Sequence, residues 1–247
     1  MGKKLEVRQL VKRFGGLLAT DRLDLSLDEG ETHALIGPNG AGKTTVMGQL
    51  TGELMPNSGR ILFDGHDITT WSTPRRALVG IARSYQITQL LEGFTVLENA
   101  MLMVQARQGH SFNAWAPVRR QAALIEPARE ALDQVGLLPR ADEDVMALAH
   151  GEHRQLELAM ALAMKPQLLL LDEPLAGMSQ AESQQMIALL QRLKGRYTML
   201  LVEHDMQAVF SLADRVSVLV YGHAIACGTP AEIQADERVR QAYLGGH

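Results

Sequence analysis

The sequence predicts an α/β protein in which a parallel sheet carries a phosphate-binding loop, an antiparallel β region comes first, and a helical unit is inserted. The loop is predicted by residues 37–45, GPNGAGKTT, which match the pattern G-x-x-x-x-G-K-[ST] at every fixed position. The parallel sheet is predicted by residues 167–171, QLLLL, an apolar run typical of strands buried on both faces. Helical patterns place the insertion at residues 90–164. We therefore expect a single domain whose core, residues 1–89 and 165–247, surrounds a helical subdomain.

Composition supports a large core and disfavours nucleic acid as a partner. The 247 residues are 46% apolar, and a net charge of −4 disfavours general nucleic-acid binding, which needs a basic surface. The single cysteine, Cys227, excludes an internal disulfide and fits a reducing compartment. The N-terminus lacks the apolar core of a signal peptide, and no apolar run approaches the roughly 18 residues of a membrane span. We expect a soluble or peripheral protein of the cytoplasm.

The first ninety residues predict an antiparallel β region followed by the start of the α/β core. Apolar and polar residues alternate in the first two strands, and the turn at Phe14 ends the first of them. A Ser-Thr-Pro sequence opens the second helix, because proline is well tolerated in a first turn. The predicted strands cover residues 5–14, 23–27, 32–36, 60–63 and 81–85, and the predicted helices cover 44–52 and 72–80.

The insertion predicts three helices. The first covers residues 95–107 and opens with a capping box, Thr95-Val-Leu-Glu98. The second covers residues 117–135 and ends at a glycine. The third covers residues 151–164, where apolar side chains recur on one face.

The remainder of the chain returns to α/β alternation. Two further capping boxes, Ser179 to Glu182 and Thr229 to Glu232, mark helix starts, the latter with proline at the first helical position. The predicted strands cover residues 167–171 and 197–202, the predicted helices cover 179–194, 206–213 and 229–244, and a hairpin covers 216–226.

The loop at residues 37–45 has the composition that phosphate binding requires. A phosphate chain lies against bare backbone N–H groups, so the wall needs glycines, and the following helix directs its N-terminal N–H groups at the anion. Lys43 can reach the β- and γ-phosphates, and the Thr44 hydroxyl can bind Mg²⁺. A glycine-rich turn that binds nothing is the alternative, which the strand–loop–helix setting argues against. The predicted binding residues are Gly37, Pro38, Asn39, Gly40, Ala41, Gly42, Lys43, Thr44 and Thr45.

Two adjacent carboxylates follow the four leucines of residues 168–171. Ligands of open α/β sheets bind at the carboxyl ends of the strands, which is where Asp172 and Glu173 stand. We expect Asp172 to hold Mg²⁺, mostly through water, and Glu173 to orient the water that attacks the γ-phosphate. Alone, an ordinary acidic turn is the better interpretation; together with the phosphate loop it is not.

This set of motifs resembles the nucleotide-binding subunit of an ABC transporter over essentially the whole chain, which implies a P-loop NTPase (RecA-like) core that binds ATP and Mg²⁺. Three positions take roles from the resemblance. Phe14 would stack on adenine, Gln86 would sense Mg²⁺ and the γ-phosphate, and His204 would contact the γ-phosphate. Each also has a plainer interpretation: a core aromatic, a solvated loop residue and a helix cap. Residues 175–178 would communicate across a dimer.

The family also has a Leu-Ser-Gly-Gly-Gln segment at the start of a helix, and this chain departs from it. Residues 148–152 read LAHGE. By resemblance, Ala149, Gly151 and Glu152 would complete the nucleotide site of the opposite subunit. Since Ala149 lacks the serine hydroxyl, one hydrogen bond to the γ-phosphate is lost, about 1.5–3 kcal/mol for a charged acceptor. We therefore hypothesise that the site receiving this segment is weakened, and that restoring serine raises ATP turnover.

Residues 83–90 and 94–99, with the ending at 242–245, resemble the ATPases of bacterial importers for branched-chain amino acids. Importers of urea and short-chain amides share much of this pattern. The resemblance implies a second ATPase subunit, in a homo- or heterodimer, two transmembrane permease subunits and, indirectly, a periplasmic solute-binding protein. It places the chain on the cytoplasmic face of the inner (plasma) membrane as a peripheral subunit without nucleic-acid partners.

Two other classes of nucleotide-binding protein agree less well with this sequence. ABC-type ATPases that act on nucleic acid or ribosomes usually carry two ATPase units or a long coiled coil, and this acidic chain has neither. P-loop kinases of small metabolites need neither the segment at residues 148–152 nor a glutamate after Asp172.

Overall fold

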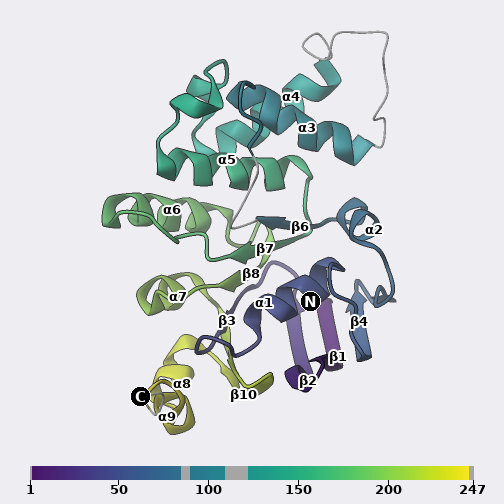
Figure 1. Cartoon of the computed structure of the whole chain (residues 1–247). Coiled ribbons are helices and arrows are strands. Elements are labelled where there is room, and N and C mark those ends of the chain that lie inside the picture. The colour runs from purple at the N-terminus through teal and green to yellow at the C-terminus, as the bar shows by residue number, and fades with distance from the viewer. Residues whose placement is uncertain (1, 85–89, 109–121, 245–247) are drawn as a thin grey trace.

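The computed structural model describes residues 2–84, 90–108 and 122–244, and its strands form two sheets (Figure 1). The first sheet is antiparallel, in the order β2-β1-β4-β5. Both long strands extend beyond their predicted alternating segments, because they pair along almost their whole length through several register shifts. Its strands are β1 (Lys3–Phe14), β2 (Leu17–Asp28), β4 (Ser58–Phe63) and β5 (His66–Asp67).

The second sheet has the order β10-β9-β3-β8-β7-β6 and forms the core of the α/β part. Its neighbours pair in parallel, except that β9 and β10 form an antiparallel hairpin. Every residue of β3, β7 and β8 is buried, which agrees with the apolar runs at residues 34–36, 168–171 and 199–202 within them. The strands are β3 (Thr32–Ile36), β6 (Ile81–Ser84), β7 (Leu168–Asp172), β8 (Thr198–Val202), β9 (Arg215–Val220) and β10 (His223–Gly228).

The leucines of β7 show how this sheet is covered. Leu168 and Leu170 join the hydrophobic cluster that contains helix α1 (Lys43–Thr51) and the inner face of the antiparallel sheet. Leu169 and Leu171 point the other way, into the cluster with α6 (Gln180–Leu193) and α7 (Met206–Leu212). Successive side chains of a strand alternate between faces. Helix α1 therefore lies between the two sheets, as Figure 1 shows.

The inserted segment is helical. Helices α3 (Val96–Gln108), α4 (Ala122–Val135) and α5 (His150–Ala163) pack on one another and lie together at one end of the molecule (Figure 1). Two short 3-10 helices, η2 (Leu138–Arg140) and η3 (Val145–Ala147), connect α4 to α5. The predicted start of α4 at residue 117 lies outside the described residues. No helix in the described ranges is both long and apolar enough to cross a membrane.

All three predicted capping boxes are present. The Glu98 carboxylate accepts from the Thr95 N–H at 2.9 Å, and the Thr95 hydroxyl accepts from the Glu98 N–H at 3.2 Å. The boxes at Ser179 and Thr229 have the same reciprocal bonds. Each such cap stabilises its helix by about 1 kcal/mol, so these helix starts are set locally by sequence.

The prediction of one continuous helix over residues 229–244 was wrong. The structure has two helices, α8 (Pro230–Ala235) and α9 (Glu237–Leu244). The interruption is Asp236, whose backbone is extended, with φ −72° and ψ 118°. Its carboxylate accepts from the Arg238 N–H at 2.8 Å and pairs with the Arg238 guanidinium. Aspartate competes well with a helical backbone in this way, and it starts a second helix.

Candidate nucleotide-binding site

The phosphate loop connects β3 to α1 and is pressed between two other strands. A Cβ atom added to Gly37 would lie 2.1 Å from the Leu219 carbonyl oxygen, and one added to Gly42 would lie 2.2 Å from that of Ala19. Such contacts are far inside van der Waals range, so both positions require glycine. A bare backbone cradle of this kind fits a chain of phosphates.

The Lys43 side chain folds back onto the backbone of its own loop. Its ammonium donates to the carbonyl oxygens of Gly37, at 2.7 Å, and Pro38, at 3.1 Å. Burial lowers the pKa of Lys43, while the nearby carboxylates of Glu173 and Asp172 act in the opposite direction. Thr44 follows on the first turn of α1 with an exposed side chain. The Lys43 ammonium is therefore held against the backbone of its own loop.

Asp172 ends β7 with its side chain 3% exposed, and Arg83 of the neighbouring strand β6 pairs with it. The Arg83 guanidinium lies 2.5 Å from the Asp172 carboxylate and 3.0 Å from that of Glu53, which follows α1. Arg83 is a residue of the site that the sequence analysis did not assign. The available signal was an arginine that follows two apolar residues inside a short predicted strand.

Glu173 and His204, which are far apart in the sequence, lie side by side in the structure. They follow β7 and β8, which are neighbours in the sheet, and β8 lies next to β3, which precedes the loop. The His204 Nε2 atom lies 2.9 Å from a Glu173 carboxylate oxygen. Glu173 has a positive φ of 50°, a strained conformation that is often found at functional sites. The plainer role for His204 is excluded, because Asp205 caps α7.

Glu203 supports the segment that follows Glu173 and the segment that contains His204. The sequence analysis did not identify it. Its carboxylate, in a residue only 5% exposed, accepts from the Leu175 N–H at 2.8 Å and from the His204 N–H at 3.0 Å. Burial raises the pKa of Glu203, although these backbone N–H groups oppose the shift. One side chain thus ties residues 175–178 to His204. The polar run Val-Glu-His-Asp after an apolar strand was the available signal.

Phe14 lies at the end of β1, where the hairpin turns into β2. Its side chain is 46% exposed, so the interpretation as a core aromatic fails. The Lys12 ammonium lies 5.2 Å from the ring centroid. Further along β2, the Ala19 carbonyl lies against Gly42 of the phosphate loop.

The segment at residues 148–152 forms the start of α5, as expected. Ala149 is the N-cap residue, and its N–H donates to the Glu152 carboxylate at 2.8 Å. Only this half of a capping box can form, because alanine has no hydroxyl. Glu152 also pairs with Arg140. The Gly151 N–H, which we expected to be open to a phosphate, donates to the Glu182 carboxylate of α6 at 3.0 Å.

The donor set fits a nucleotide with Mg²⁺. In the described part of the chain, no group of three or more His, Cys, Asp or Glu side chains is placed to hold a metal ion. Mg²⁺ needs no such group, since one or two protein oxygens and the substrate phosphates commonly hold it. The Thr44 hydroxyl and the Asp172 carboxylate are oxygen donors of the right kind. Gln86, expected to sense the metal, lies outside the described residues.

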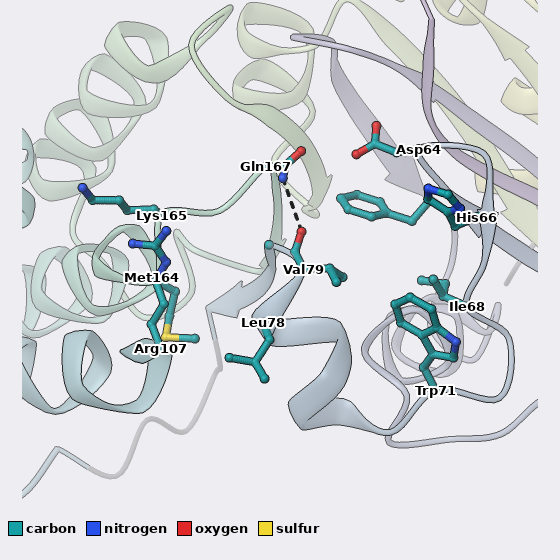
Figure 2. Close-up of a pocket in the computed structure, with 12 residues that line it drawn as sticks. Asp64, His66, Ile68, Trp71, Leu78, Val79, Arg107, Met164, Lys165 and Gln167 are labelled. Atoms are coloured by element: carbon teal, nitrogen blue, oxygen red, sulfur yellow. Dashed lines mark hydrogen bonds between the residues drawn. The ribbon is translucent and has the colours of Figure 1, made fainter. Parts of the chain in front are cut away.

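Two adjoining hollows share the side chain of Met164. An apolar groove of about 470 Å³ runs between the core and the helical unit, and Ala77, Met103, Ala106, Met160 and Met164 are among its lining residues. A second hollow of about 270 Å³ shares Met164 with it. Figure 2 shows Arg107, Met164 and Lys165 on one side of the second hollow's Leu78 and Val79, with Ile68 and Trp71 on the other.

Comparison with known proteins gives consistent results. A family model described as ABC transporter matches residues 20–176. A second model, described as branched-chain amino acid ATP-binding cassette transporter, matches residues 225–247. The chain is 38% identical over 249 residues to the high-affinity branched-chain amino acid transport ATP-binding protein BraF of Pseudomonas aeruginosa, which covers 98% of this chain and 97% of that protein. LivG of Escherichia coli, of the same description, is 37% identical over the same shares.

Solved structures agree with the fold. An ATP-binding cassette of an ABC transporter in its ADP conformation matches with a TM-score of 0.88 at 28% identity, over 99% of this chain and 100% of that one. A nucleotide-free cassette matches with a TM-score of 0.86 at 27% identity, over 98% and 99% of the two chains.

Proposed function

This chain belongs to the ATP-binding cassette family of ABC transporters, and from this premise we propose that it is the ATP-binding and ATP-hydrolysing subunit of a branched-chain amino acid importer. The observation that carries the proposal is the glycine-walled loop with the Glu173–His204 pair at the ends of neighbouring strands. The names of BraF and LivG support the class of solute. An importer of urea, short-chain amides or other amino acids is the alternative.

In this proposal, the residues of the loop bind and orient the triphosphate. The N–H groups of residues 37–45 line the phosphates, and Lys43 leaves the carbonyl oxygens of its own loop for the β- and γ-phosphates. The Thr44 hydroxyl and the Asp172 carboxylate would hold Mg²⁺, together with Gln86, and the ion would neutralise phosphate charge. Phe14 stacks on the adenine.

Hydrolysis then needs a group that directs water at the γ-phosphate. Glu173 orients and polarises that water, and His204, hydrogen-bonded to it, contacts the γ-phosphate. Glu203 keeps His204 and residues 175–178 in register. Ala149, Gly151 and Glu152 complete the site of a second ATPase subunit, so ATP draws two subunits together because it binds the closed pair better than the open one.

The apolar groove is the proposed docking surface for a permease subunit. It lies between the nucleotide-binding core, residues 1–89 and 165–247, and the helical subdomain, residues 90–164. Closure of the dimer moves these two parts, and so moves whatever the groove holds. The chain is then a peripheral subunit on the cytoplasmic face of the inner membrane. It serves two permease subunits and, through them, a periplasmic solute-binding protein.

Substitution of Glu173 tests the proposal. Glu173→Gln should retain ATP binding and lower phosphate release by about 100-fold or more, since an oriented general base contributes roughly 10²–10⁴ in rate. The exposed Glu237→Gln on α9 is the matched control. Phosphate release and ATP titration measure the two effects. Turnover that persists in Glu173→Gln would contradict the assignment, and absence of ATP binding by the parent protein would contradict the function.

A further inference from the structure

Glu182 joins the start of α6 to the start of α5. One carboxylate oxygen, Oε2, accepts from the Ser179 N–H at 2.9 Å and the Ser179 hydroxyl at 2.6 Å, which completes the capping box of its own helix. The other oxygen, Oε1, accepts from the Gly151 N–H at 3.0 Å. A Cβ atom on residue 151 would lie 2.8 Å from Oε1, so glycine at this position allows the carboxylate to approach.

This N–H is the one that the proposed function assigns to the nucleotide of the opposite subunit. A carboxylate and a γ-phosphate are both anions that accept from helix N-terminal N–H groups. One N–H cannot serve both fully, and two like charges a few ångström apart repel each other. In the proposed function, the Glu182 carboxylate therefore competes with the incoming phosphate for the Gly151 N–H.

The surroundings do not neutralise this carboxylate fully. Its bonded partners, Ser179 and Gly151, are neutral. The hydrogen bonds from Ser179 and Gly151 lower the pKa of Glu182, which keeps it an anion. Glu152, the other carboxylate at the start of α5, is already paired with Arg140. A hollow of about 230 Å³ between the two helix starts gives the Glu182 side chain room to move.

We propose that Glu182 is a built-in competitor of the opposite subunit's ATP, which sets the ATP concentration at which the two subunits close. The inference rests on the proposed function, because it presumes that Gly151 faces a nucleotide in the closed pair. During closure Oε1 leaves the Gly151 N–H, while Oε2 remains on Ser179. The α6 cap thus survives, and only the contact between the two helices is exchanged for a contact with phosphate.

The chain supplies a matched control. Glu232 closes the Thr229 capping box of α8 with the same bonds, accepting from the Thr229 N–H at 2.7 Å and its hydroxyl at 2.9 Å. Glu182→Gln and Glu232→Gln therefore remove one charge from equivalent caps. Only the first of them removes the charge that lies on Gly151.

The experiment measures ATP hydrolysis against ATP concentration for the subunit assembled with its transporter partners. Glu182→Gln should lower the half-saturating ATP concentration at least five-fold with little change in maximal rate, and Glu232→Gln should stay within two-fold of the parent. Hydrogen exchange at the Gly151 amide should be faster in Glu182→Ala than in the parent, and unchanged in Glu232→Ala.

A half-saturating concentration that stays within two-fold of the parent in Glu182→Gln, or rises, would overturn this inference while leaving the proposed function intact. Equal shifts in the two Gln variants would also overturn it, because the effect would then belong to helix capping. A parent protein that neither binds nor hydrolyses ATP would overturn both the inference and the proposed function.

Discussion

At the scale of single residues, two buried carboxylates of this protein respond to pH in opposite directions. Glu203 is buried next to His204, and this burial raises its pKa. Burial also acts to raise the pKa of Glu31. Hydrogen bonds from His33 and from the Asp28 N–H, with electrostatic attraction to His33 and Arg215, outweigh the effect of burial, so the pKa of Glu31 is lowered.

The signs follow from linkage between protonation and folding. A carboxyl whose folded-state pKa is raised destabilises the folded protein when it is ionised. This destabilisation is absent below the unfolded pKa, near 4.5, and complete above the folded pKa. Glu203→Gln mimics the neutral form, so its free energy of unfolding should gain on that of the parent as pH rises through this window. Glu31 contributes stability above its unfolded pKa and loses it as pH falls through its folded pKa.

Denaturant unfolding between about pH 2.5 and 8, which reaches below the lowered pKa of Glu31 and above the raised pKa of Glu203, measures these differences. Glu31→Gln is the control of opposite sign and should fall behind the parent as pH rises from the acid end. A difference between parent and Glu203→Gln that does not vary with pH would refute the assigned pKa shift.

A second prediction concerns Ala149. Its φ of −69° and ψ of 164° match those of Ser179, which caps α6 with its hydroxyl. In Ala149→Ser the hydroxyl can accept from the Glu152 N–H and still donate to a phosphate. We expect stabilisation of about 0.5–1 kcal/mol from the cap and a higher ATP turnover, as the sequence hypothesis holds. A fall in turnover despite the better cap would contradict the hypothesis.

At the scale of the elements, Arg76 fixes helix α2 (Thr73–Leu78) to the end of α1. It is fully buried, and its guanidinium donates to four backbone carbonyls, those of Gln49, Leu50, Thr69 and Trp71. Two of these belong to the last turn of α1, whose carbonyls have no partners within the helix. Burial lowers the pKa of Arg76 to about 10, so the side chain remains a cation at neutral pH.

Removal of this cation should cost much stability. Arg76→Met leaves four carbonyl groups without their donor, and we expect a loss of about 3 kcal/mol or more in the free energy of unfolding. Arg75→Met is the control: its guanidinium stacks on Trp71 at 3.7 Å, an exposed contact worth roughly 0.5–1 kcal/mol. Equal losses in the two variants, measured in denaturant, would show that Arg76 does not organise the end of α1.

At the scale of the whole molecule, the apolar groove lies where the core meets the helical unit. A charge placed there should disturb docking and leave the nucleotide loop intact. We expect Ala106→Glu to lower recovery of the permease subunits in co-purification by about ten-fold, or roughly 1.4 kcal/mol, with unchanged ATP affinity. Ala231→Glu, an exposed position on α8, should have no effect. Normal recovery with Ala106→Glu would exclude the groove as the docking surface.

The sequence by itself determined which segments form helices and strands, and where along the chain the nucleotide-binding motifs lie. Strand faces, capping boxes and the phosphate loop depend on residues close together in the chain, so Gly37, Gly42, Asp172 and Glu173 were identified from local patterns. The break at Asp236 was local too, but its aspartate was interpreted as a helical residue.

Only the tertiary structure decided which distant groups meet. Arg83 reaches Asp172 and Glu203 reaches Leu175 because parallel strands far apart in sequence end at one edge of the sheet. Glu182 reaches Gly151 because α5 and α6 pack together across a separation of 31 residues. A sequence pattern has a range of one or two helical turns, whereas a buried charge takes its partner from whatever the packed core brings within hydrogen-bonding distance.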